Sequence, residues 1–109
     1  MNDTELAIRT QRDEWEQLVP MWIHGRPEST RNVYLPEIRT FRKWLGEQVQ
    51  ISQITLGNLQ NWSDYLAKGH KPRTIKRMLS TVKSLLTFCH RVGFLQINVG
   101  AALRVPKVP

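Results

Sequence analysis

The sequence predicts an all-α fold, in which a compact bundle of four helices is followed by a short fifth helix. Apolar residues recur every three or four positions along most of the chain, which is the period of an amphipathic helix. No stretch shows the apolar–polar alternation that a half-buried strand requires. With 109 residues, 40% of them hydrophobic and 23% charged, the chain has the size and composition of one globular domain.

The first helix is predicted from about Gln11 to His24, after a polar segment, residues 1–10, that we expect to form a flexible arm. Pro20 should kink or shorten this helix, because proline lacks the backbone N–H that a helix uses. Residues 25–27, with the sequence Gly-Arg-Pro, should then form a turn. The apolar residues at helical spacing are Trp15, Leu18, Val19, Trp22 and Ile23.

The second helix is predicted over residues 28–46, with a bend near its start caused by Pro36. Residues 47–53 should form a connector. The apolar stripe of the helix consists of Tyr34, Ile38, Phe41 and Leu45. The far side carries the polar and basic residues Asn32, Arg39 and Lys43.

The third helix has the clearest start signal, because Thr55 is a favourable N-cap residue. Its inward-facing residues should be Leu59, Trp62 and Leu66, and it should end by Gly69. Together with the aromatic residues of the first two helices, Trp62 is expected to pack in the core rather than to stack on a ligand.

The longest helix is predicted from Pro72 to Gly93, since no proline or glycine interrupts the residues between them. Asn98 should cap a short final helix over residues 99–103. The tail, residues 104–109, contains two prolines and should be an extended linker. The apolar face of the long helix comprises Ile75, Met78, Leu79, Val82, Leu85, Leu86 and Cys89.

The opposite side of this long helix is basic and contains no acidic residue. Solvated helix faces usually mix the two signs, because like charges one turn apart destabilise a helix. Arginine binds phosphate through two parallel hydrogen bonds, and serine and threonine add hydrogen bonds at close approach. We therefore predict contact with nucleic acid rather than plain solvation. The stripe consists of Arg73, Arg77, Ser80, Ser84, Thr87 and Arg91, with Lys76 and Lys83 on its shoulder.

The charge distribution along the chain favours the same interpretation. Sixteen Lys and Arg residues against nine Asp and Glu residues give a net charge of +7. Residues 1–20 contain five acidic and two basic residues, whereas the chain beyond Asp64 contains nine basic residues and no acidic one. This asymmetry predicts a polyanionic partner for the second half of the chain.

No cofactor, metal site or catalytic site is predicted. The three histidines do not have metal-ligand spacing, and a single cysteine cannot build a zinc site or an internal disulfide. Cys89 should be a small buried hydrophobic residue, and a lone thiol favours a reducing, cytoplasmic setting. The four tryptophans, with Tyr34 and Tyr65, are expected to pack in the core. No stretch is long enough to span a membrane.

Two stretches are typical of a known family. The first is Thr30-x-x-x-Tyr34-x-x-x-Ile38-x-x-Phe41-x-x-Trp44-Leu45. The second is Pro72-x-Thr74-Ile75-x-Arg77-x-Leu79-Ser80-x-Val82-x-Ser84-Leu85-Leu86-x-Phe88. In this order, over roughly residues 12–107, the chain resembles the N-terminal core-binding domain, often called SAM-like, of the phage-integrase family of tyrosine recombinases.

The resemblance implies an orthogonal four-helix bundle, here residues 11–103, that forms half of a C-shaped clamp on double-stranded DNA. Residues 104–109 would lead to a catalytic domain of the same full-length protein, and that domain would hold all of the catalytic residues. This chain would then be a monomer that is not itself an enzyme and that assembles on DNA with other recombinase protomers. In the family, the second and fourth helices approach the major groove. The candidate DNA-binding residues are Asn32, Arg39, Lys43, Arg73, Thr74, Lys76, Arg77, Ser80, Lys83, Ser84, Thr87 and Arg91.

Two other interpretations of the basic face remain open. The helical bundle could be a protein-interaction module whose basic face binds an acidic partner. A basic amphipathic surface could also dock on anionic membranes, although helices of that kind seldom belong to a complete bundle with its own core. Binding to duplex DNA should depend steeply on salt and need no protein partner, which separates it from the first alternative.

Overall fold

The computed structural model describes residues 13–107, and all of its regular secondary structure is helical. The predicted arm and residues 108–109 of the predicted linker lie outside this range. The described residues contain no strand, so the predicted all-α fold is confirmed. The α-helices are α2 (Glu14–Ile23), α3 (Glu28–Leu45), α4 (Leu56–Ala67) and α5 (Pro72–Arg91), and two 3₁₀ helices are η1 (Ile51–Gln53) and η2 (Val99–Ala102).

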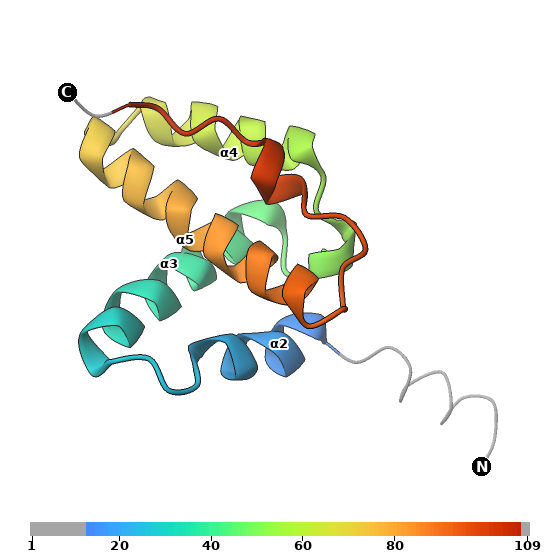
Figure 1. Ribbon diagram of the computed structural model, residues 1–109. Coiled ribbons are helices and arrows are strands. Elements are labelled where there is room, and N and C mark those ends of the chain that lie inside the picture. The colour runs from blue at the N-terminus through green and yellow to red at the C-terminus, as the bar shows by residue number, and fades with distance from the viewer. Residues whose placement is uncertain (1–12, 108–109) are drawn as a thin grey trace, which may run out of the picture.

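Helix α5 is the central element of the fold. Figure 1 shows it crossing the middle of the molecule, between α4 on one side and α2 and α3 on the other. It packs against all three of these helices and against η2. The buried residues of α5 include every residue of the predicted apolar face, which confirms that prediction. They also include Thr81, which the sequence pattern did not single out.

Aromatic side chains fill the space between α2, α3 and α4. Trp15, Trp22 and Trp62 are buried, and Phe41 packs edge-on against Trp62 with ring centroids 5.4 Å apart. The core role predicted for the tryptophans is confirmed for these three, and Trp44 is partly buried against the same cluster. The predicted core role is wrong for Tyr65, which stacks on Trp62 at 5.7 Å but leaves 51% of its surface exposed.

The start of α2 is set by Asp13, whose carboxylate accepts hydrogen bonds from the backbone N–H groups of Trp15 and Glu16. This helix therefore begins at Glu14, and the predicted start near Gln11 lies outside the described residues. For α4, the predicted cap is confirmed, because Thr55 and Asn58 exchange hydrogen bonds between side chain and backbone.

The segment predicted to be a plain connector between α3 and α4 is partly ordered as η1. Ile51 is buried, and the Glu14 carboxylate accepts hydrogen bonds from the backbone N–H of Ser52 at 2.8 Å and from its hydroxyl at 3.0 Å. The Trp15 indole N–H donates to the Val49 carbonyl at 2.8 Å. These contacts fasten the connector to the first turn of α2.

The chain after α5 folds back onto the bundle. Gly93 has φ +81°, so the predicted left-handed end of the helix is confirmed. Asn98 occupies the N-cap position of η2, but contrary to the prediction its side chain makes no cap hydrogen bond. Its amide N–H donates to the Thr87 hydroxyl at 3.1 Å, and its Oδ1 has no hydrogen-bond partner among the described residues. Gly100 lies against Leu86, where a Cβ atom would stand 3.3 Å from the leucine Cδ1.

Candidate nucleic-acid interface

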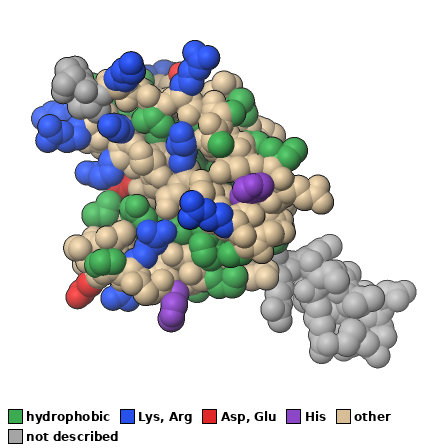
Figure 2. Space-filling view, in the orientation of Figure 1, with side chains coloured by type: hydrophobic (Ala, Val, Ile, Leu, Met, Phe, Trp, Pro, Cys, Tyr) green, Lys and Arg blue, Asp and Glu red, His purple; other side chains and the backbone are tan. Residues whose placement is uncertain are grey.

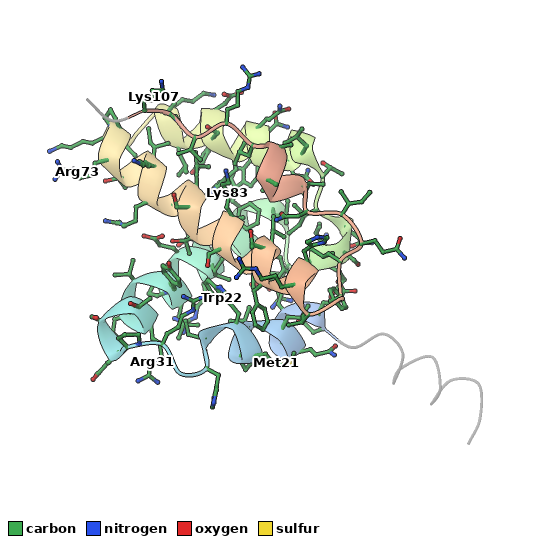
Figure 3. All side chains as sticks on the ribbon, in the orientation of Figure 1. Met21, Trp22, Arg31, Arg73, Lys83 and Lys107 are labelled. Carbon is green, nitrogen blue, oxygen red and sulfur yellow. The ribbon has the colours of Figure 1, made fainter. Side chains whose placement is uncertain are left out.

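Basic side chains gather on the face of the molecule that α5 crosses. Figure 2 shows many Lys and Arg side chains and few acidic ones on this face. In Figure 3, Arg73 extends into solvent at the start of α5, and Lys107 lies at the same end of the molecule. The positive charge of the second half of the chain is therefore displayed on the surface.

Four of the predicted residues of α5 are exposed and have no side-chain hydrogen bond to any other residue in the range 13–107. They include three cations spread over the length of the helix and one small hydroxyl residue. Thr74, which was also predicted, is half-buried and is not one of these four. The four exposed side chains can turn toward a phosphate without first breaking a hydrogen bond to another residue in that range. The four are Arg73, Lys76, Ser80 and Arg91.

Arg77 differs from these residues because α3 supplies an acidic partner for it. Its Nε donates to Oε1 of Glu37 at 2.7 Å, and the Thr81 hydroxyl donates to Oε2 of the same carboxylate at 2.7 Å. Glu37 is only 8% exposed, whereas the Arg77 side chain is 57% exposed. The stripe contains no acid within α5, as predicted, but an acid of α3 lies beside it.

Three further residues of the predicted stripe are half-buried and engaged within the protein. The Ser84 hydroxyl accepts a hydrogen bond from the Trp22 indole at 3.1 Å, and the Thr87 hydroxyl accepts one from Asn98. The Lys83 ammonium donates to the Leu103 carbonyl at 3.0 Å. Figure 3 shows Trp22 and Lys83 on opposite sides of α5. The prediction of one continuous solvent-facing stripe is therefore corrected, because neighbouring segments pack along its edges.

The predicted residues of α3 are exposed, and none of them makes a hydrogen bond or ion pair with the α5 stripe in the part of the chain that the structure describes. Asn32 and Lys43 project from the surface of α3. Arg39 lines a groove between α2 and α3, whose apolar wall includes Trp15 and Pro20. α3 approaches α5 through Glu37, whose carboxylate binds Arg77 and Thr81.

Two arginines that the sequence reasoning did not select are held by aromatic rings. The Arg26 guanidinium lies 5.4 Å from the Trp22 ring and 5.3 Å from the Tyr34 ring. Arg42 lies over Trp15 and forms an ion pair with Asp13. Both arginines bind within the fold, and the spacing of arginines along the sequence gives no signal for this.

The ion pair with Arg42 affects the titration of Asp13. Burial alone would raise the pKa of this carboxyl group, but the hydrogen bond from Arg42 and the backbone N–H groups of α2 outweigh the burial. The pKa of Asp13 is therefore held below its ordinary value of 3.8.

Within residues 13–107, no group of His, Cys, Asp and Glu side chains is arranged to hold a metal ion. Cys89 is fully buried, and desolvation raises the pKa of its thiol to about 11, so the thiol stays protonated near neutral pH. Its predicted role as a small hydrophobic residue is confirmed. No helix in the described range has the length and hydropathy needed to cross a membrane.

Residues 23–93 match the model of the family described as "Phage integrase, N-terminal SAM-like domain". Among curated proteins, tyrosine recombinase XerD of Vibrio cholerae is 28% identical over 92 residues, which cover 82% of this chain and 30% of the relative. Tyrosine recombinase XerC of Mycobacterium tuberculosis is 30% identical over 97 residues, which cover 87% of this chain and 32% of the relative. The chain thus spans about a third of the length of these relatives. No solved structure gives a significant match.

Proposed function

This chain belongs to the family of phage integrase N-terminal SAM-like domains, and from that membership we propose that it is the DNA-binding module of a site-specific tyrosine recombinase or integrase. In this proposal the module binds duplex DNA and has no catalytic activity of its own. Cutting and rejoining of DNA would belong to a catalytic domain of the full-length protein, joined through the segment that begins at residue 104. The module would be a monomer alone and would assemble on DNA with other recombinase protomers.

The observation that carries the proposal is the run of exposed cations along α5 that have no acidic partner within residues 13–107. Arg73, Lys76 and Arg91 are exposed, and α5 contributes no acid near them. A helix of 20 residues is about 30 Å long, which exceeds the width of the major groove, about 12 Å. Cations near both ends of α5 can therefore reach phosphates on either side of that groove.

The remaining candidates have different places in the proposed interface. Asn32, Arg39 and Lys43 would form a secondary contact from α3. Lys83, Ser84 and Thr87 would act mainly by holding neighbouring segments against α5, since their polar groups already have partners. Affinity would then depend chiefly on the exposed cations of α5.

The test is a titration of a fluorescently labelled, mixed-sequence duplex by fluorescence anisotropy at several salt concentrations. About four phosphate contacts predict a slope of about −3.6 for log affinity against log salt. Arg73→Ala should weaken binding and reduce the size of the slope by about one.

The matched control is Arg31→Ala, which removes an exposed arginine at the start of α3, far from Arg73 in Figure 3. It should leave affinity and slope nearly unchanged. A flat salt dependence, with equal affinities for the wild type and Arg73→Ala, would overturn the proposal and favour an acidic protein partner.

A further inference from the structure

We propose that Glu37 is a positioning residue for DNA binding, which holds the Arg77 guanidinium so that its outer edge is presented to a phosphate. The inference rests on the proposed function and adds to it a role for a buried acid of α3. An acidic residue beside a DNA-binding surface ordinarily weakens binding, because it repels the phosphates. The position of Glu37 beside the basic face therefore calls for a role other than a direct effect of its charge on DNA.

The geometry of the three-residue cluster supplies that reason. One carboxylate oxygen of Glu37 binds Nε of Arg77 and the other binds the Thr81 hydroxyl, so neither oxygen can rotate away. The Thr81 hydroxyl also lies 3.1 Å from the Arg77 carbonyl. Thr81 is 1% exposed and Glu37 is 8% exposed, so the cluster is anchored inside the α3–α5 contact. The Arg77 guanidinium is thus held by the buried Glu37 carboxylate through one nitrogen, Nε.

The hydrogen bond at Nε leaves the opposite edge of the guanidinium, with its two terminal nitrogens, free to bind a phosphate. Arginine has five N–H donors in a planar fork, and Nε carries one of them. Within residues 13–107, neither terminal nitrogen of Arg77 makes a hydrogen bond, and the side chain is 57% exposed. The two terminal nitrogens form the edge that pairs with two phosphate oxygens in parallel. With Nε fixed, that edge keeps one orientation.

A fixed orientation lowers the entropy lost on binding, since a free arginine must give up several rotamers to contact a phosphate. The exposed Arg73 has no such anchor among the described residues. The proposal therefore assigns two kinds of cation to α5, with Arg77 held in place and Arg73, Lys76 and Arg91 mobile. The proposal also predicts that removal of the negative charge of Glu37 weakens DNA binding, whereas simple electrostatics predicts that it strengthens binding.

The experiment is a double-mutant cycle on the 109-residue chain, with affinity for a labelled mixed-sequence duplex measured by anisotropy. Glu37→Met replaces the acid by an apolar side chain of similar length and frees the guanidinium. It should weaken binding by about three- to tenfold. In the Arg77→Ala background the same change should leave affinity unchanged or raise it, because the carboxylate then only repels phosphate.

Melting curves show whether Glu37→Met is folded. If it is not, the variant Arg77→Lys tests the positioning role of Glu37 instead. Lysine keeps the positive charge, but an ammonium bound to Glu37 has no separate outer edge. Arg77→Lys should therefore lose at least half of the binding free energy lost by Arg77→Ala. The control Arg73→Lys should lose little, because an unanchored lysine can turn onto a phosphate.

The outcomes separate the two proposals. A wild-type chain that binds duplex DNA without salt dependence overturns the proposed function itself. If the wild type binds with a steep salt slope but folded Glu37→Met binds as tightly or more tightly, DNA binding stands and the positioning role is wrong. Full retention of affinity by Arg77→Lys would likewise overturn the positioning role.

Discussion

The indole N–H of Trp22 donates a hydrogen bond to the hydroxyl of Ser84, although 62 residues separate them in the sequence. Trp22 is 2% exposed, so its indole nitrogen has little access to water as a substitute partner. Ser84 therefore links α5 to α2 at the edge of the basic face, and its main role is to stabilise the packing of these two helices.

Ser84→Ala should lower the free energy of unfolding by about 1–3 kcal/mol, because it leaves the buried indole donor without an acceptor. Ser80→Ala is the matched control, since Ser80 lies one turn earlier on α5 and is exposed. It should change stability by less than about 0.5 kcal/mol. Urea unfolding followed by circular dichroism measures both. Equal stability of the two variants would contradict a structural role for the Trp22–Ser84 contact.

Leu79→Ala should destabilise the chain by about 2–5 kcal/mol, because Leu79 is fully buried at the centre of α5 and its truncation leaves a cavity. Ile97→Ala removes a similar apolar side chain that is 73% exposed, and it should cost far less. Thermal or urea unfolding compares the two variants. A melting temperature for Leu79→Ala within one degree or so of the wild type would mean that the α5 core is wrongly placed.

Arg77→Ala should reduce stability as well as DNA affinity, in contrast to the expectation for a purely solvent-facing residue. The change leaves the Glu37 carboxylate buried with Thr81 as its remaining partner, and we expect a loss of about 1–3 kcal/mol. Arg73→Ala, which breaks no hydrogen bond or ion pair within residues 13–107, should affect binding but hardly alter unfolding. Unfolding free energies of the two variants that agree within error would show that the ion pair contributes nothing to stability.

The depressed pKa of Asp13 predicts a stability change in acid. A carboxyl group whose pKa is lower in the folded state stabilises the fold above its unfolded pKa, here near 3.8, and loses that contribution as the pH falls through the folded value. Asp13→Asn keeps an N-cap side chain but removes the charge that pairs with Arg42. The variant should be less stable than the wild type at neutral pH, and the difference should shrink below about pH 4. A difference that is constant with pH would contradict this assignment.

Local periodicity was sufficient to predict the helices and the inner face of α5, because burial of one helix side leaves a repeat of three and four residues. It could not reveal the partners of individual polar groups. Glu37 and Arg77 are 40 residues apart, and Lys83 meets Leu103 only because the chain folds back after α5. The predicted stripe was therefore too wide, since a helix wheel does not show which neighbours cover its edges.

The same limit explains the residues that were assigned differently. Tyr65 sits at a helical spacing that suits the core, yet it lies at the rim of the aromatic cluster, where half of its surface meets solvent. Asn98 is a favourable cap type, but its amide N–H binds a hydroxyl on α5 and its Oδ1 accepts no hydrogen bond from η2. In both cases tertiary packing decided between two roles that the residue type allows equally.

The return of the chain after α5 also determines how far a neighbouring domain could move. Leu103 is buried and its carbonyl is held by Lys83, so residues 94–103 are committed to the bundle. A domain joined beyond residue 107 would be tethered from Leu103 or a later residue, since Val105 also packs against the core, rather than from Gly93. Residues 94–103, which could span about 33 Å if extended, would therefore not lengthen the tether between the two domains. A shorter tether raises the effective concentration of one domain near the DNA held by the other.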